Sequence, residues 1–267
     1  MRGRRELMLA AGVAWFAAHG SSIAQTRRRD APEKQGGKTR MNILMIATSA
    51  DKLGQSGHAT GVWLEELTTP FYAFRDGGGE VTLASIEGGA IPIDTRSVKE
   101  AGQNEASVER YLSDPAFRHR VADTPKFTNI DLSGFDAVFL PGGHGTMTDY
   151  PENSALARLI EQFDRSGRIV SAVCHGPAGL LSARKADGAP FVAGRRVSAF
   201  ADSEERAVGL EHTVPFLLED RLRASGALYE RGPDFTSFAI QDGNLLTGQN
   251  PASAARVAAL VIQRLKA

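Results

Sequence analysis

The chain has 267 residues, of which 42% are hydrophobic, and its 31 basic residues equal its 31 acidic residues in number. These values describe a globular protein of one large or two small domains, and they exclude a disordered, collagen-like or multispanning chain. The single cysteine also excludes an intramolecular disulfide framework and a zinc site built from several thiolates.

Residues 1–24 have the layout of a secretory signal peptide. A basic start (MRGRR) is followed by an apolar run over residues 7–18 and by the small-residue ending SIA. The apolar run has 12 residues, whereas a helix that spans a bilayer needs about 20. The pair Arg4-Arg5 with the Glu-Leu-Met that follows resembles a twin-arginine export signal, which serves proteins that cross a membrane already folded.

We therefore expect the protein to be periplasmic or secreted, without a membrane span once the leader is removed. Two alternatives stay open. An uncleaved leader would anchor the protein to the membrane, and a start of translation at Met41 would leave it in the cytoplasm.

Residues 25–40 (QTRRRDAPEKQGGKTR) contain six basic residues, two acidic ones and nothing that could nucleate a core, so we expect a flexible tether. Without the leader and the tether, residues 41–267 contain 22 basic and 28 acidic residues, a formal charge of −6. An acidic domain is a poor candidate for a nucleic-acid binder, whose affinity depends on neutralising phosphates.

From Met41 onward, apolar runs alternate with amphipathic segments in a single pattern. The runs are continuous, which is typical of strands buried on both faces of a parallel sheet. We expect strands at 42–47, 80–85, 136–140, 168–173, 195–200, near Tyr229 and at 245–247. We expect helices at 61–75, at 105–121 within an irregular stretch, and at 153–165, 214–225 and 252–265. The pattern predicts one open α/β sandwich with a mostly parallel sheet over 41–267.

The only cysteine, Cys174, lies where a buried strand meets a segment of small residues (SAVCHGPAGL). A sharp turn at such a place lifts the central side chain out of the sheet, as in the nucleophile elbow of hydrolases. At a helix N-terminus the thiol would also feel the positive end of the helix dipole, which favours the thiolate. We therefore interpret Cys174 as a nucleophile rather than as a small buried hydrophobic residue.

A nucleophile of this kind needs a base and donors for developing negative charge. His175 is the adjacent base, although only a strained elbow could bring two neighbouring side chains together. The glycine-rich turn PGGHG at 141–145 follows another strand end. If the two strands are neighbours, the N–H groups of Gly143 and His175 could converge beside the thiol as an oxyanion hole.

The base in turn needs an acid that orients it. The stretch FADSEE, which follows a predicted strand, offers three carboxylates: Asp202, Glu204 and Glu205. Most clusters of this kind are solvated surface, and spacing alone selects none of the three.

Several ordered motifs together resemble the ThiJ/PfpI superfamily, and most closely its branch of heat-shock chaperones and glutathione-independent glyoxalases. These motifs are TGVWLEE at 60–66, PGGHGT at 141–146, CHGP at 174–177 and TGQNPAS at 247–253. The resemblance covers residues 41–265 and leaves out the leader and the tether. It implies a flavodoxin-like three-layer α/β/α sandwich with a nucleophile elbow, as in class I glutamine amidotransferases, and usually a homodimer.

By position, the resemblance implies that Cys174 is the nucleophile and His175 the base of a Cys-His-acid triad. It implies Glu205 as the acid, with Glu204 and Asp202 as alternatives. Which of the three carboxylates completes the triad is a question for the structure.

The resemblance also assigns residues around the triad. Glu66 matches a buried helical glutamate that hydrogen-bonds the thiol, whereas Glu65 would face elsewhere on the helix. Buried beside a thiol, such a glutamate should have its pKa raised by desolvation and could exchange protons near neutral pH. Gly142, Gly143 and His144 would line the pocket and hold the substrate oxygen.

The activity implied is that of a lyase of the glyoxalase III type (D-lactate dehydratase), which converts methylglyoxal or glyoxal to the hydroxy acid without glutathione, as part of a stress response. The same chemistry could remove such groups from glycated proteins. The reaction requires no metal and no organic cofactor. Two alternatives remain: a holdase chaperone for unfolded proteins without essential catalysis, and a cysteine peptidase of the PfpI type.

The chain departs from neighbouring branches in two ways. Glutamine amidotransferases pair the elbow cysteine with a downstream His-x-Glu, which is absent after Cys174, where the only later histidine is His212, expected on the surface. Some chaperone-type relatives carry a metal site of two histidines and a carboxylate. Here His58 and His119 are isolated in the sequence, so we expect no metal.

Overall fold

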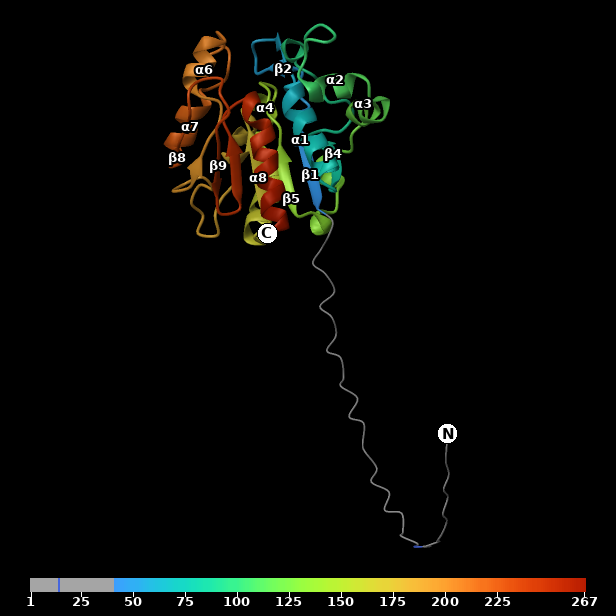
Figure 1. Ribbon diagram of the computed structural model, residues 1–267. Coiled ribbons are helices and arrows are strands. Elements are labelled where there is room, and N and C mark those ends of the chain that lie inside the picture. The colour runs from blue at the N-terminus through green and yellow to red at the C-terminus, as the bar shows by residue number, and fades with distance from the viewer. Residues whose placement is uncertain (1–13, 15–40) are drawn as a thin grey trace, which may run out of the picture. The chain divides into compact units, whose positions relative to one another are not determined.

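The computed structural model describes residue 14 and residues 41–267, so the expected leader and tether lie almost wholly outside the described residues. Six strands form the central sheet in the order β4-β1-β5-β6-β10-β9 (Figure 1). All neighbours are parallel except β9, which pairs antiparallel with β10 at one edge. The strands are β1 (Asn42–Ala47), β4 (Glu80–Ser85), β5 (Ala137–Leu140), β6 (Ile169–Val173), β9 (Ala239–Asp242) and β10 (Leu245–Gly248).

Two small ribbons and eight α-helices complete the described fold. The ribbons are β2 (Lys52–Leu53) with β3 (His58–Ala59), and β7 (Arg196–Val197) with β8 (Leu228–Tyr229). The helices are α1 (Leu64–Asp76), α2 (Ala106–Leu112), α3 (Pro115–Ala122), α4 (Thr146–Asp149), α5 (Ser154–Arg165), α6 (Asp202–Ala207), α7 (Leu218–Ala224) and α8 (Ala254–Lys266). Short 3₁₀ segments are η1 (Thr95–Ser97), η2 (Phe127–Asn129), η3 (Leu132–Gly134), η4 (Gly176–Leu180) and η5 (Pro251–Ser253).

The sheet is covered on both faces, which confirms the predicted three-layer sandwich. Helices α1 and α8 pack against each other on one face, and α5 with η4 covers the other. Along β1, Ile43 and Met45 point into the α1/α8 layer, and Leu44 and Ile46 point into the α5 layer. Since successive side chains of a strand alternate between faces, both faces must be apolar, and this explains the continuous apolar runs.

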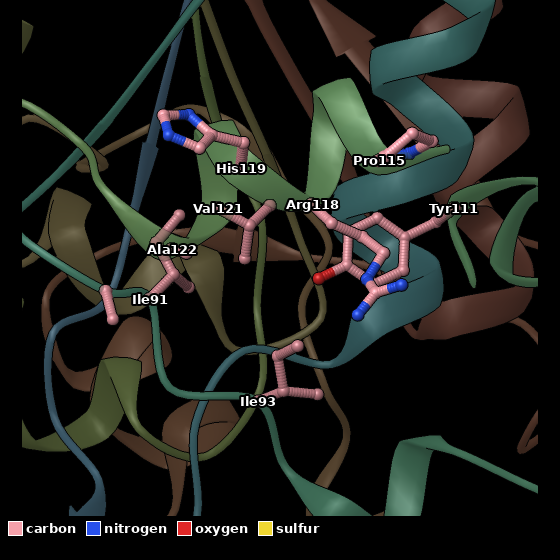
Figure 2. A pocket seen from close by; sticks show the side chains of 9 residues that line it. Ile91, Ile93, Tyr111, Pro115, Arg118, His119, Val121 and Ala122 are labelled. Atoms are coloured by element: carbon pink, nitrogen blue, oxygen red, sulfur yellow. The ribbon is translucent and has the colours of Figure 1, made fainter. Parts of the chain in front are cut away.

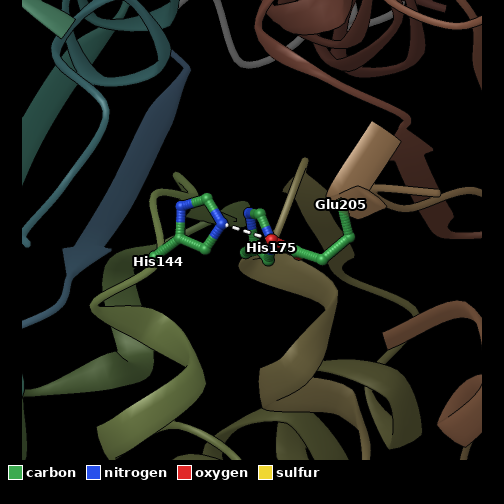
Figure 3. A group of neighbouring side chains, drawn as sticks. All are labelled: His144, His175 and Glu205. Carbon is green, nitrogen blue, oxygen red and sulfur yellow. Dashed lines mark hydrogen bonds and ion pairs between the residues drawn. The ribbon is translucent and has the colours of Figure 1, made fainter. Parts of the chain in front are cut away.

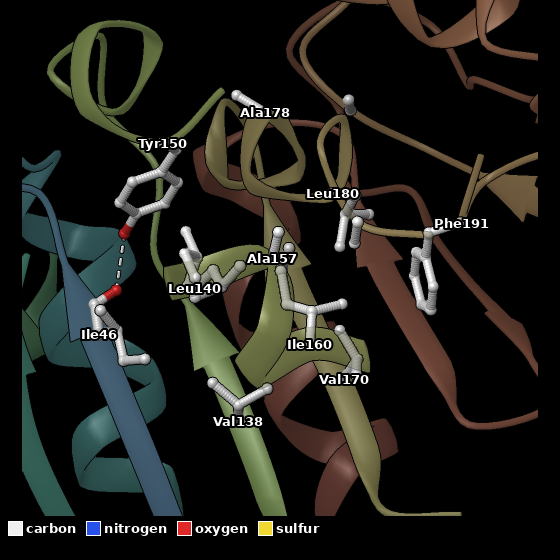
Figure 4. Packing of buried hydrophobic residues seen from close by; sticks show 14 of the residues in the cluster. Ile46, Val138, Leu140, Tyr150, Ala157, Ile160, Val170, Ala178, Leu180 and Phe191 are labelled. Carbon is white, nitrogen blue, oxygen red and sulfur yellow. Dashed lines mark hydrogen bonds between the residues drawn. The ribbon is translucent and has the colours of Figure 1, made fainter. Parts of the chain in front are cut away.

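The α5 layer is also fixed by a polar contact. Figure 4 shows Val138 and Leu140 of β5 packed beside Ile160 of α5 and below Tyr150. The buried Tyr150 hydroxyl donates to the carbonyl oxygen of Ile46 at 2.6 Å, which ties the end of α4 to β1. The turn after β5 is therefore held against β1 as well as against its own strand.

Several element boundaries differ from the sequence-based expectation. The helix expected at 105–121 is two helices, because Asp114 caps α3 through the Phe117 N–H and Pro115 starts it. The strand expected at 195–200 is only the two-residue β7, which lies outside the main sheet. The remaining helices start later than expected, at Leu64, Leu218 and, after η5, at Ala254.

Five strands and helices were not expected at all: β2, β3, β9, α4 and α6. Gly243 and Asn244 form the two-residue loop between β9 and β10, and a Gly-Asn pair between two apolar runs is a hairpin signal. No helix among the described residues is both long and apolar enough to cross a membrane.

The expected elbow is present at the end of β6. Cys174 has a φ of +58°, in the left-handed region that non-glycine residues rarely occupy. Its N–H donates to the Gly248 carbonyl, and its own carbonyl accepts from the Phe200 N–H, both at 2.9 Å. Contacts from two neighbouring segments thus maintain the strained conformation.

We predict that Gly176→Ala destabilises the elbow. A Cβ at Gly176 would lie 2.3 Å from the Leu140 carbonyl oxygen, so β5 and η4 would have to separate. Overpacking of this kind costs about 1–3 kcal/mol, which urea unfolding would measure. Gly134→Ala, where a Cβ meets no atom within 4 Å, is the matched control and should leave the free energy of unfolding unchanged. Equal stability of both variants would contradict the close packing.

Candidate active site

Cys174, His175 and Glu205 form a continuous hydrogen-bonded line. The Cys174 Sγ lies 3.2 Å from His175 Nδ1, and His175 Nε2 lies 2.8 Å from Glu205 Oε2. All three residues are buried. The strained backbone of Cys174 turns two adjacent side chains towards each other, as the sequence analysis required.

Among the three candidate carboxylates, the structure brings Glu205 to the base. Glu204 points away from His175: its oxygens accept from the N–H groups of Ala201 and Phe235 and from the Asn250 side chain. Asp202 lies near Asp220 and Glu219, and burial together with these carboxylates raises the pKa of Asp202 to about 6. Neither Glu204 nor Asp202 contacts the imidazole of His175.

A second imidazole reaches the same carboxylate. His144 Nε2 lies 2.8 Å from Glu205 Oε1, so the two oxygens of Glu205 are shared between His144 and His175 (Figure 3). The other ring nitrogen of His144, Nδ1, lies 3.3 Å from the Arg96 guanidinium. Arg96 is itself paired with the buried carboxylate of Asp94 through two hydrogen bonds, of 3.0 and 2.6 Å.

This chain of contacts fixes the positions of the protons. A guanidinium can only donate, so His144 Nδ1 must accept from Arg96, and its proton must be on Nε2, where it is donated to Glu205. If Glu205 also accepts from His175 Nε2, then Nδ1 of His175 has a free lone pair facing the thiol. His175 is therefore arranged to take the proton of Cys174.

The charges follow the same pattern. Burial alone would raise the pKa of Glu205, but its electrostatic interactions and hydrogen bonds with His175 and His144 outweigh burial and lower that pKa below its usual range. Burial and the nearby His175 lower the pKa of His144 to about 4. Around neutral pH the network therefore combines an ionised carboxylate with an uncharged His144.

Glu66 approaches the thiol from α1 and is fully buried, whereas the neighbouring Glu65 is half-buried. Oε2 of Glu66 accepts from the Gly142 N–H at 2.9 Å, and Oε1 of Glu66 has no hydrogen-bond partner within residues 41–267. Burial raises the pKa of Glu66 well above its ordinary value, against smaller opposing interactions with Cys174 and Gly142. A buried carboxyl group with a raised pKa can donate a proton in its acid form and accept one in its ionised form.

One expectation about the thiol was wrong. The segment after Cys174 is the five-residue 3₁₀ turn η4 rather than an α-helix, so it offers no extended helix dipole. Burial, followed by the effect of Glu66, raises the pKa of Cys174 well above its ordinary value. The resting nucleophile is a thiol, and the thiolate must be generated by proton transfer to a base.

The glycine-rich turn after β5 contributes backbone groups. Gly143 has a φ of +99°, and a Cβ there would lie 2.4 Å from the Gly61 carbonyl oxygen, so only glycine fits. The Gly143 N–H interacts with Cys174 and lowers the pKa of the thiol, against the larger effect of burial. Gly142, expected among the pocket residues, uses its N–H on Glu66 and is not available to a substrate oxygen.

The thiol opens into a cavity of about 350 Å³. Its lining is Trp63, Arg96, Gly143, His144, Cys174, His175, Phe200, Val208, Phe235 and Pro251. A larger, shallower hollow of about 550 Å³ lies between α2, α3 and the loop around Ile91 and Ile93 (Figure 2). It contains His119 and Arg118 but no nucleophile, so we assign the chemistry to the smaller cavity.

His144, His175 and Glu205 also have the composition of a metal site, and their donor atoms lie within 4.8 Å of one another. In the structure the carboxylate already accepts from both imidazoles, and the Arg96 cation lies beside one of them. A metal ion would have to displace both ring protons against that charge, so we assign these residues to hydrogen bonding. His58 and His119 are exposed and separate from this group.

Residues 58–264 match the DJ-1/PfpI family. The chain belongs to this family. It is 34% identical to the Saccharomyces cerevisiae glutathione-independent glyoxalase HSP31, over 84% of this chain and 97% of that protein. It is 29% identical to the Pseudomonas aeruginosa protein/nucleic acid deglycase HchA, over 86% of this chain and 81% of that protein. The crystal structure of Candida albicans glyoxalase III superposes with a TM-score of 0.75 at 29% identity, over 84% of this chain and 96% of that chain.

The family expected from the motifs is thus confirmed, and the structure brings together the side chains of Cys174, His175, Glu205, Glu66 and His144. Sequence reasoning placed His144 in the pocket but missed its contact with Glu205. It also missed Arg96, which lies in the 3₁₀ segment η1, and Asp94, which caps that segment, because this stretch contains no motif. His212, expected on the surface, has a side chain that is 93% exposed.

We predict that Glu66→Gln makes Cys174 more reactive. The isosteric amide cannot become negative, so the contribution of Glu66 to the raised pKa of the thiol should be lost and that pKa should fall. Alkylation by iodoacetamide as a function of pH would measure this shift cleanly, because the chain has no other cysteine. Glu65→Gln, on the same helix, is the control and should change the profile much less. A shift of the Glu66→Gln profile to higher pH would contradict the assignment.

Proposed function

We propose that the protein is a cysteine-dependent glyoxalase of the glyoxalase III type, which converts methylglyoxal to D-lactate without glutathione. The observation that carries the proposal is that two groups able to exchange protons lie beside the thiol: His175 Nδ1 at 3.2 Å, and the buried carboxyl of Glu66, whose pKa burial raises. The glyoxalases among its relatives support the same reaction class.

The first step is addition of the thiol to the aldehyde carbon C1. His175 Nδ1 accepts the thiol proton while Glu205 holds the Nε2 proton, and the sulfur forms a bond to C1. The aldehyde oxygen gains negative charge, which the N–H groups of Gly143 and His175 could stabilise. Transfer of the carboxyl proton of Glu66 to this oxygen then gives the hemithioacetal and leaves Glu66 as a carboxylate.

The second step moves hydrogen within the substrate. A base removes the proton from C1 to give an enediol, and reprotonation at C2 gives a lactoyl thioester. C1 is oxidised by two electrons and C2 is reduced by two, so the step needs no external redox partner. The Glu66 carboxylate is suited to it because its Oε1 has no hydrogen-bond partner within the described residues and because burial raises its pKa, which makes it a stronger base than an exposed carboxylate.

In the last step water adds to the thioester carbonyl, the C1–S bond breaks, and lactate leaves as the thiol of Cys174 is restored. The same addition and hydrolysis could act on aldehyde-derived adducts of protein side chains, as the name of the Pseudomonas relative indicates for that protein. We therefore include glycated side chains among the proposed substrates.

We predict that purified residues 41–267 form lactate from methylglyoxal without glutathione and that Cys174→Ala abolishes this activity, because no other thiol is present. Enzymatic assays specific for D- and L-lactate would measure the rate and the stereochemistry. Glu66→Gln should reduce turnover at least about 100-fold, in the range of general acid–base contributions. Full activity of Cys174→Ala would exclude the mechanism, and no lactate from a folded, reduced protein would favour the chaperone or peptidase hypothesis.

We predict that His144→Phe shifts the acid limb of kcat/KM to higher pH. Glu205 would lose one of the two donors that lower its pKa, so that pKa would rise, and the active form would be lost at a higher pH as the pH falls. A hydrogen bond to a charged group contributes about 1.5–3 kcal/mol, so a shift of about one unit or more is expected. His212→Phe, at an exposed position, is the control and should leave the profile unchanged. An unshifted limb in His144→Phe would show that Glu205 does not need the second donor.

A further inference from the structure

We propose that Phe235 forms an aromatic subsite at the mouth of the cavity, and that the preferred substrates are α-oxoaldehydes, R–CO–CHO, in which R is aromatic or otherwise bulky and apolar. This inference rests on the proposed glyoxalase function and specifies its substrate class. It starts from a mismatch between methylglyoxal and the space around the thiol.

The cavity is larger than methylglyoxal needs. Its 350 Å³ correspond to roughly ten water molecules at about 30 Å³ each, and such volumes accept ligands of considerable size. A substrate with only a methyl substituent would leave most of this space to solvent. A larger apolar substituent would displace that water.

The walls away from the thiol are apolar. Trp63, Phe200, Val208, Phe235 and Pro251 line this part of the cavity. The one guanidinium in the lining, Arg96, is already paired with Asp94 and His144. The lining therefore favours an uncharged substituent over an anionic one.

Successive ring contacts connect the base His175 to Phe235 through Phe200. The ring of Phe200 lies 4.5 Å from that of His175, and the ring of Phe235 lies 6.3 Å from that of Phe200, at 63°. These separations are those of interacting aromatic pairs. A substrate with C1 at the Cys174 Sγ would extend its substituent along Phe200 towards Phe235.

Phe235 is held in this place at a conformational cost. Its φ is +57°, a left-handed value that is unusual for a bulky residue, and its side chain is 49% exposed. Its N–H donates to Glu204 Oε1 at 2.6 Å, and the same oxygen accepts from the Asn250 side chain, which also donates to the Thr236 carbonyl. Hydrogen bonds to buried polar groups thus maintain the strained backbone of Phe235 and place its aromatic ring at the cavity mouth. Strained residues of this kind are typical of binding sites.

The structure also gives Glu204 a role: its carboxylate holds the loop that carries Phe235. Glu204 precedes Glu205 on α6, so one short helix fixes both the carboxylate of the triad and the loop that carries Phe235. The distance between the reacting centre and the aromatic rim is therefore set by adjacent residues of one helix. This coupling is expected where a substrate must reach from one to the other.

The test compares phenylglyoxal with methylglyoxal. The wild-type protein should show the higher kcat/KM with phenylglyoxal, and Phe235→Ala should lower the ratio of the two values about 10-fold, at the lower end of what a hydrophobic pocket discriminates. Phe235→Gly should lower the ratio equally, because it relieves the backbone and removes the same ring, and Phe235→Leu should retain most of it. Leu228→Ala, at an exposed apolar position outside the cavity, is the control and should change neither rate.

A wild type without preference for phenylglyoxal, or an equal loss with both substrates in Phe235→Ala, would overturn the subsite. A binding measurement separates this failure from failure of the proposed function. Mandelate, the hydroxy acid that phenylglyoxal would give, should bind to Cys174→Ala more tightly than lactate, and Phe235→Ala in that background should weaken mandelate alone. If the folded wild type converts neither aldehyde but mandelate still binds in this way, the function fails and the subsite stands; equal binding of the two acids overturns the subsite whatever the activity.

Discussion

The carboxylate of Glu205 is the group on which the rest of the site depends. Its two oxygens each accept from an imidazole at 2.8 Å, so one side chain sets the tautomers of both His144 and His175. A protonated Glu205 could accept from only one of them in the same way. Arg96 and Asp94 extend this constraint to a loop far away in the sequence, because the guanidinium leaves His144 no choice of tautomer.

The site contains two carboxyl groups with opposite properties. Glu205 receives two hydrogen bonds and lies beside His175, which lowers its pKa, whereas Glu66 is buried with one hydrogen bond from Gly142, and burial raises its pKa. Environments that separate the pKa values of two like groups allow one to act as an orienting anion and the other as a proton carrier. The turn after β5 contacts both carboxyl groups, since Gly142 donates to Glu66 and His144 donates to Glu205.

The sequence predicted those parts of the site that depend on strand ends. Continuous apolar runs identified β5 and β6. Because parallel strands end at one edge, the Gly-rich turn and Cys174 would meet there if the two strands were neighbours, and the structure shows that they are. Burial of Glu66 and selection of Glu205 came from the family resemblance, since neither follows from local pattern. Arg96, Asp94 and Phe235 were not predictable, because they lie in loops whose paths are set by tertiary hydrogen bonds rather than by periodicity.

The raised pKa of the Cys174 thiol determines when the sulfur becomes reactive. A thiol is a weaker nucleophile than a thiolate and is also less easily oxidised. Here burial keeps the sulfur protonated, and His175 can accept its proton only along the short path from Sγ to Nδ1. The reactive form is then generated when an electrophilic carbon is present to take up the charge. A carbonyl group held beside the Gly143 N–H can take up this charge, whereas a small oxidant without a fixed position cannot. The burial that lowers the resting reactivity of Cys174 therefore also favours reaction with a bound carbonyl over oxidation.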